Sequence, residues 1–141
     1  MHYVEVIPDR PDFRVFIDLL YGHGRNVDTD GDAEPVSSRG WTWLYLKDRE
    51  SEDPSVTISA DEETPTSYRI ESASVRLEEL TALYLFLHCG RSIWTAERQL
   101  HDEEVDALEN RYRAELQRAL ASIWHQSTLR HPYPKLPTAR S

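Results

Sequence analysis

Sulfur-containing side chains are scarce in this sequence of 141 residues, which has one cysteine, Cys89, and one methionine. A single cysteine excludes a disulfide bond within the chain, and it also excludes a zinc site built from cysteines. The first residues contain no basic segment followed by an apolar one, so we expect no signal peptide. Together these features favour a cytoplasmic location.

Long apolar runs are also missing. The longest nearly unbroken one, Leu80 to Cys89, is about half as long as a membrane-spanning helix requires, so we expect no membrane contact. Apolar residues still make up 39% of the chain and charged residues 29%, which is typical of a folded protein. We expect a single α+β domain over residues 1–130, followed by an extended, proline-rich tail over residues 131–141.

The motifs of common enzymes are absent, since the sequence has no nucleophile elbow, Walker loop or dinucleotide fingerprint. His88 and Cys89 are adjacent, and on a helix their side chains diverge by about 100°, which disfavours a nucleophile–base pair. His23, between Gly22 and Gly24, is a weak candidate for a general base oriented by a carboxylate. We expect no cofactor and favour a protein that is not an enzyme, with catalysis through His23 as an alternative.

Basic residues are too few to balance the acidic ones, and the formal net charge is −9. The excess is concentrated in residues 28–79, where fourteen Asp and Glu stand against five Lys and Arg. Such a field repels nucleic-acid phosphates and attracts basic proteins or cations. We therefore expect a basic protein partner and no nucleic-acid ligand.

Apolar spacing predicts the helices. Apolar residues between Phe13 and Leu20 recur at helical intervals, and residues 77–88 are apolar nearly all round, as in a buried helix that ends at Gly90. A long C-terminal helix is predicted from Asp102 onward, with helically spaced apolar residues at Val105, Leu108, Tyr112, Leu116, Ala119 and Ile123.

Alternation of side chains predicts the strands. Residues 3–7 form the first, a polar loop covers residues 23–39, and three more strands follow as an antiparallel meander. Residues 91–101 fit either a strand or a helical turn. The expected fold is α+β, with a mostly antiparallel sheet of about four strands in the order β-α-β-β-β-α-α. The three meander strands are expected at residues 41–46, 55–59 and 67–75.

The meander places two acidic segments at the same end of the sheet, because the loop entering its first strand and the loop joining its second and third strands share that end. Carboxylates gathered there repel one another unless something cationic binds. A basic protein partner is one interpretation, and solvated loops that aid solubility are the other. The candidate residues are Asp28, Asp30, Asp32, Glu34, Asp61, Glu62 and Glu63.

A divalent metal is a further alternative for the first of these segments. Residues 26–32 resemble the first seven positions of an EF-hand calcium loop, with oxygen-bearing side chains at alternate positions and Gly31 at the sixth. Ser37 stands where the loop requires a bidentate Glu, so the match is weak. The candidate ligands are Asn26, Asp28, Asp30 and Asp32.

Aromatic side chains alternate along the second predicted strand, where Trp41, Trp43 and Tyr45 are interleaved with Leu44 and Leu46. The preferred interpretation packs the aromatic stripe beneath the helices. Because the opposite face is apolar as well, the alternative is an aromatic binding surface rimmed by acid, with Trp41 and Trp43 as anchors.

Size, charge and the absence of catalytic motifs together suggest an acidic protein that caps or inhibits a basic protein partner. Immunity proteins and antitoxins do this to toxic nucleases, and the comparison is an analogy alone. One alternative is a small enzyme that uses His23 with loop carboxylates and a divalent ion. Another is an assembly subunit that pairs through its long C-terminal helix. The sequence leaves the oligomeric state open.

Overall fold

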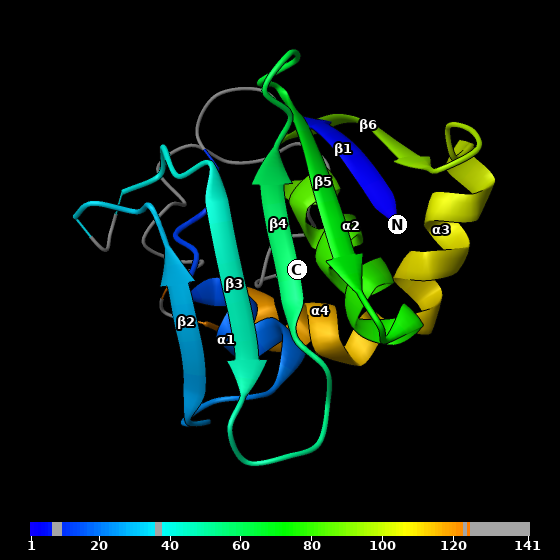
Figure 1. The fold of residues 1–141 in the computed structure, drawn as a ribbon. Coiled ribbons are helices and arrows are strands. Elements are labelled where there is room, and N and C mark those ends of the chain that lie inside the picture. The colour runs from blue at the N-terminus through cyan, green and yellow to red at the C-terminus, as the bar shows by residue number, and fades with distance from the viewer. Residues whose placement is uncertain (7–9, 36–37, 123, 125–141) are drawn as a thin grey trace.

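The computed structural model has one antiparallel sheet with helices packed against one of its faces (Figure 1). It describes residues 1–6, 10–35, 38–122 and 124, so the tail predicted for residues 131–141 lies outside the described residues. The elements are β1 (His2–Val6), α1 (Val15–Leu20), β2 (Val27–Gly31), β3 (Trp43–Asp48), β4 (Val56–Ala60), β5 (Ser67–Ser72), α2 (Val75–Cys89), β6 (Gly90–Thr95), α3 (Asp102–Arg111) and α4 (Arg113–Leu120).

The sheet has six strands in the order β2-β3-β4-β5-β1-β6, and every neighbouring pair is antiparallel. The prediction of about four strands was therefore wrong, although the α+β class and the meander of β3, β4 and β5 are present. The N-terminal strand β1 lies between β5 and β6, with His2 opposite Ile70 on one side and Thr95 on the other.

The two additional strands have weak sequence signals: β2 was predicted as part of a polar loop, and β6 lies in residues that fit either a strand or a helical turn. Strand β2 contains two Asp residues and Gly31, which disfavour strands, and it forms because β3 offers it a partner. Strands β2 and β3 come close at Gly31, where an added Cβ would lie 2.6 Å from the Trp43 carbonyl oxygen. Strand β6 starts at Gly90, directly after the last residue of α2, so no turn separates the two elements.

Helices α1, α2 and α4 lie behind the sheet in Figure 1. The core forms between α2 and the sheet, where Leu46, Ile58 and Ile70 are fully buried against helix residues such as Leu83. Helix α2 is buried nearly all round, as its composition predicts, and it ends at Cys89. It is the longest helix in the described part of the chain, where no helix is long and apolar enough to cross a membrane.

The single long C-terminal helix was also wrongly predicted, because the chain breaks at Tyr112 (φ −108°, ψ 24°) into α3 and α4. The Tyr112 hydroxyl donates to Glu79 Oε1 of α2 at 2.7 Å, and Arg111 pairs with the same carboxylate at 3.1 Å. The break lets α4 pack against α1, where the Arg118 guanidinium donates to the Leu19 carbonyl at 2.7 Å. The apolar stripe of both helices is buried within the chain.

Candidate functional site

Two acidic loops lie at one end of the sheet, as shown at the top of Figure 1. The β2–β3 connection carries Asp32 and Glu34, and the β4–β5 connection carries residues 61–63. The two connections are neighbours because the Ala60 amide donates to the Thr42 carbonyl at 2.9 Å. We call this cluster the acidic end, and it comprises Asp32, Glu34, Asp61, Glu62 and Glu63.

Asp28 and Asp30 lie in β2 and not in a loop, because residues predicted as a polar connection form an edge strand. Asp28 lies opposite Lys47 of the adjacent strand β3 and forms an ion pair with Arg49 at 3.2 Å. It is at the end of β2 that is remote from the acidic end. Asp30 lies opposite Tyr45, closer to the acidic end. The structure therefore separates Asp28 from the other predicted carboxylates and keeps Asp30 near them.

Two carboxylates of the acidic end are hydrogen-bonded within their own loops. Asp32 accepts from the Thr42 amide at 2.8 Å and from the Trp43 amide at 3.0 Å, which fixes the start of β3. Burial raises the pKa of Asp32, but the hydrogen bonds from Thr42 and Trp43 outweigh it and hold that pKa below its ordinary value. Asp61 accepts from the Glu63 amide at 2.8 Å in the β4–β5 turn. The exposed carboxylates of Glu34, Glu62 and Glu63 have no such role in the hydrogen bonds that the structure describes.

The two predicted tryptophan anchors have opposite environments. Trp41 precedes β3 and is 1% exposed, with its Nε1 donating to the Pro11 carbonyl at 2.8 Å. The Tyr68 hydroxyl donates to the Trp41 carbonyl at 3.0 Å, and the Arg10 guanidinium lies over both rings. Trp41 is therefore a core residue. Trp43 is 39% exposed and stands beside the acidic end.

The aromatic stripe of β3 faces away from the helices, so the preferred sequence interpretation was wrong. Leu44 and Leu46 are the buried residues of this strand, and Trp43 and Tyr45 alternate with them on the opposite face. No described helix covers that face, which we call the helix-free face (Figure 1). It includes Tyr3, Asp28, Asp30, Trp43, Tyr45, Ser59, Arg69, Glu71 and Trp94.

A line of side chains crosses five strands on the helix-free face. The line ends on strand β6 at Trp94, which is 41% exposed. The sequence did not single out Tyr3 or Trp94, because β1 was assigned no faces and residues 91–101 were left open between a strand and a helical turn. The alternation of Tyr3 with Val4 could have placed Tyr3 on this face. The strand registers align the line as Trp43, Ser59, Arg69, Tyr3 and Trp94.

A hollow of 420 Å³ opens in the middle of this line, between the aromatic residues and the acidic end. The hollow exists because the side chain of Ser59 is small. Tyr3 and Arg69 form its sides, and Asp61 and Glu62 lie at its rim. Arg69 forms an ion pair with Glu71 at 2.7 Å, which offsets its charge. An aromatic wall beside two carboxylates can accept a cationic side chain.

The weak metal candidates do not converge on one point. Residues 26–32 run as an extended chain, so alternate side chains are about 6–7 Å apart along the strand and cannot wrap an ion as a calcium loop does. Asp28 and Asp32 are in addition engaged by Arg49 and Thr42. Among the described residues, no group of three or more His, Cys, Asp or Glu side chains is arranged to hold a metal ion.

His23 contacts a helical carboxylate and none of the loop carboxylates that the enzyme hypothesis requires. Its Nδ1 lies 3.2 Å from Asp18 Oδ2 of α1, and its side chain is 59% exposed. Gly22 and Gly24 on either side have φ of 108° and 73°, so the loop turns sharply and presents the ring to solvent. Asp18 is the one polar partner that the described part of the chain gives His23, so nothing there completes a catalytic arrangement.

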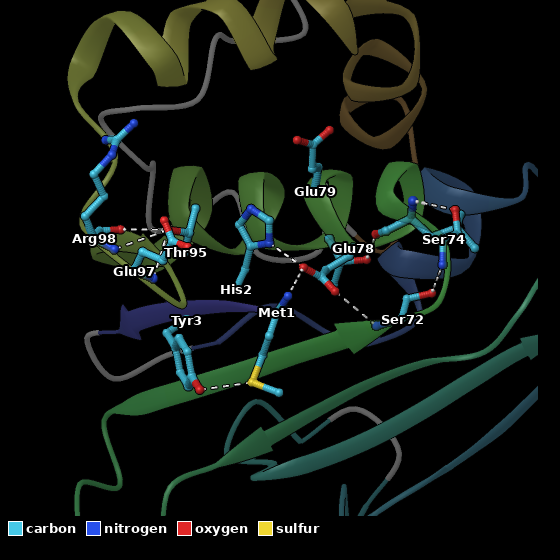
Figure 2. A network of polar contacts seen from close by, with 12 residues as sticks. Met1, His2, Tyr3, Ser72, Ser74, Glu78, Glu79, Thr95, Glu97 and Arg98 are labelled. Carbon is cyan, nitrogen blue, oxygen red and sulfur yellow. Dashed lines mark hydrogen bonds and ion pairs between the residues drawn. The ribbon is translucent and has the colours of Figure 1, made fainter.

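A second histidine–carboxylate pair, His2 with Glu78, lies on the helix side of the sheet (Figure 2). Glu78 Oε2 lies 2.5 Å from His2 Nδ1 and 2.7 Å from the Met1 amino nitrogen, and Oε1 accepts from the Ser72 amide at 3.3 Å. Burial raises the pKa of Glu78, but these donors outweigh it and lower that pKa. Both carboxylate oxygens are thus engaged in tying the first turn of α2 to β1 and β5, which is a structural role.

Comparisons with protein-family models, with curated proteins and with solved structures gave no match to this chain.

Proposed function

We propose that this chain is a binding protein that caps or inhibits a basic protein partner through its helix-free face and the adjoining acidic end. One observation supports this most: Trp43, Tyr45, Tyr3 and Trp94 stand on a sheet face that no described helix covers, next to a cluster of carboxylates. Exposed aromatic side chains are the residues that most often anchor a protein interface, and a charged rim around them selects the partner.

The charge distribution supports a cationic partner. The formal net charge is −9. In the described part of the chain, no ion pair joins a basic side chain to the exposed carboxylates of Asp30, Glu34, Glu62 and Glu63. Such a surface attracts a positively charged protein over distances of about 10 Å at moderate salt. We expect fast association that slows as salt is added.

The two alternative functions have less support. The enzyme hypothesis needs loop carboxylates near His23, and that residue contacts Asp18 of α1. The assembly hypothesis needs an apolar helix stripe free to pair with a neighbour, and Val105, Leu108 and Leu116 are already buried inside the chain. We therefore retain binding as the single proposal.

The test compares two charge variants that remove the same number of carboxylates. The first changes Asp30→Asn, Glu34→Gln and Glu62→Gln beside Trp43. The matched control changes three exposed acids of α3, with Asp102→Asn, Glu103→Gln and Asp106→Asn. Each protein is used to capture partners from native lysate at low salt, and retained proteins are identified by mass spectrometry.

We expect wild type and the control variant to retain the same basic protein, which moderate salt releases, and the first variant to lose it. A Trp43→Ser variant with unchanged charge should also lose it, because the anchor is removed. Equal retention by both charge variants, or no retention by wild type, would refute the proposal and leave the acidic end as a solubility feature.

A further inference from the structure

The two edges of the sheet differ in whether their backbone groups are already bonded. Along β6 the outer groups are used by the chain itself. The Thr95 amide donates to the Arg98 carbonyl at 2.8 Å, the Leu100 amide donates to the Ile93 carbonyl at 2.9 Å, and Trp94 bridges to Gln99. The second half of this edge, from Ile93 to Thr95, is therefore closed to another strand.

The β2 edge is open among the described residues. The Arg49 amide donates to the Asn26 carbonyl at 3.0 Å, and the Asp32 amide donates to the Trp43 carbonyl at 3.3 Å. In an antiparallel pair such bonding residues alternate, so Asp28 and Asp30 also turn their backbone groups toward β3. The amide and carbonyl groups of Val27 and Thr29 point outward, and no described residue bonds to them. Gly31 also faces outward, and its amide donates to Asp30 Oδ1 at 2.8 Å.

A cavity adjoins this open edge. It has a volume of 190 Å³, and its lining residues are Phe13, Thr29, Asp30, Gly31, Ala33, Trp41, Trp43 and Leu44. Most of its wall is apolar, so the side chain that fits it is apolar. An open strand edge beside such a cavity is the arrangement by which sheets bind extended peptides, because backbone hydrogen bonds give affinity and the cavity selects a side chain.

We propose that an extended segment of the basic partner binds as a seventh strand along β2. Asp28 and Asp30 stand on the helix-free face, two residues apart, so an added strand meets them with alternate side chains. Lysine or arginine opposite Asp30 would pair with its carboxylate, and a basic side chain opposite Asp28 would share that carboxylate with Arg49. The intervening side chains face the helix side, and one of them enters the cavity. The recognised segment is therefore extended, with basic and apolar residues in alternation.

Charge disfavours a second copy of the chain at this edge. Pairing of β2 with another β2 would bring Asp28 and Asp30 of one copy beside the same residues of the other, and like charges on adjacent strands are destabilising. Acidic side chains on an exposed edge are a common protection against such self-association. The occupant is thus a cationic segment from a different protein.

The test uses a short synthetic peptide in which lysine and valine alternate, and a copy of it that is N-methylated where its amides would face β2. The methyl groups remove hydrogen-bond donors without changing charge or requiring a protein variant. We expect the unmodified peptide to bind and to slow hydrogen exchange at the Val27 and Thr29 amides by tenfold or more. The methylated peptide should bind roughly tenfold more weakly or worse, since backbone bonds are lost.

This inference rests on the proposed function, but the two fail differently. Equal binding of both peptides, or binding without protection of the Val27 and Thr29 amides, would overturn strand addition and leave the proposed function standing. Failure of both peptides to bind would also overturn strand addition, whereas the capture experiment decides separately whether a basic protein is bound. Protection of both amides by self-association in the absence of peptide would show that the edge belongs to a second copy and would overturn the inference.

Discussion

The junction between α2 and β6 depends on the absence of a side chain at Gly90, and the change Gly90→Ala tests this. The backbone there is extended (φ −91°, ψ 149°), so alanine could adopt it without conformational strain. Space is the constraint, because an added Cβ would lie 2.6 Å from Phe86 Cα and 2.9 Å from the Phe86 carbonyl oxygen. Two of the colliding atoms belong to the backbone of α2 and cannot rotate away.

The expected loss of stability follows from these contacts. Forcing a methyl group into a packed site costs about 1–3 kcal/mol, and the rigid backbone of α2 at Phe86 puts Gly90→Ala at the upper end of that range. Alanine also lowers the conformational entropy of the unfolded chain, which stabilises the folded state by about 0.4–1 kcal/mol and offsets part of this loss. We therefore expect Gly90→Ala to lower the free energy of unfolding by about 2 kcal/mol and the melting temperature by roughly 6 °C.

Urea denaturation followed by tryptophan fluorescence measures this difference, with Gly40→Ala as the matched control. At Gly40 the nearest atom to an added Cβ is Ser38 Oγ at 3.7 Å, an ordinary contact. Gly40→Ala should therefore leave stability unchanged or raise it by up to about 1 kcal/mol. If Gly90→Ala proves as stable as Gly40→Ala, the tight junction between α2 and β6 is wrong.

Three further predictions concern other parts of the molecule. Trp41→Ala should cost about 3–5 kcal/mol in urea denaturation because the ring is buried, whereas Trp43→Ala should change stability by less than about 0.5 kcal/mol; similar losses would contradict their assigned environments. The pKa of Glu78 is lowered in the folded state, so its ion pairs stabilise the fold above the ordinary value of 4.5, and this contribution is lost as pH falls through the folded pKa. The melting temperature of Glu78→Gln should therefore change less with pH in that range than the melting temperature of wild type does. Parallel curves for the two proteins would count against the network. Burial raises the pKa of the Tyr68 hydroxyl to about 12, although the charge of Arg10 lowers it. The hydroxyl therefore ionises at lower pH in the unfolded chain than in the folded one, and wild type should lose stability between pH 10 and 12. Tyr68→Phe should lose less stability over this range, and an equal loss would place the hydroxyl in solvent.

Sequence patterns identified the elements whose stability comes from their own composition. Helix α2 is apolar over its whole length, and the strands β3, β4 and β5 alternate clearly, so each was found before the structure was known. Strand β2 was missed because Asp28, Asp30 and Gly31 disfavour strands, and its pairing with β3 overrides that preference. The break at Tyr112 was missed because the apolar spacing continues through it without a Gly or Pro signal.

The candidate surface could be predicted only in part. The sequence placed Asp32, Glu34 and residues 61–63 at one end of the sheet from the meander alone, and they lie there. It could not decide which face of β3 meets the helices, because that strand is apolar on both faces and a one-residue choice reverses every side chain. It also could not bring Tyr3 and Trp94 to the same surface, since that requires knowing that β1 and β6 are neighbours.

The position of β1 between β5 and β6 has a consequence for how the chain folds. Residues 2–6 are synthesised well before residues 67–70 and 90–95, with which they pair, so the sheet cannot be completed until β6 has been made. Contacts this distant in sequence are associated with slow folding, because a long loop must close before they form. We therefore expect β2, β3, β4 and β5 to pair early, with one side of β5 unpaired until the long loop closes and β1 pairs with it. During that interval the exposed side of β5 is where the nascent chain is most open to aggregation, and where a chaperone would be of most use.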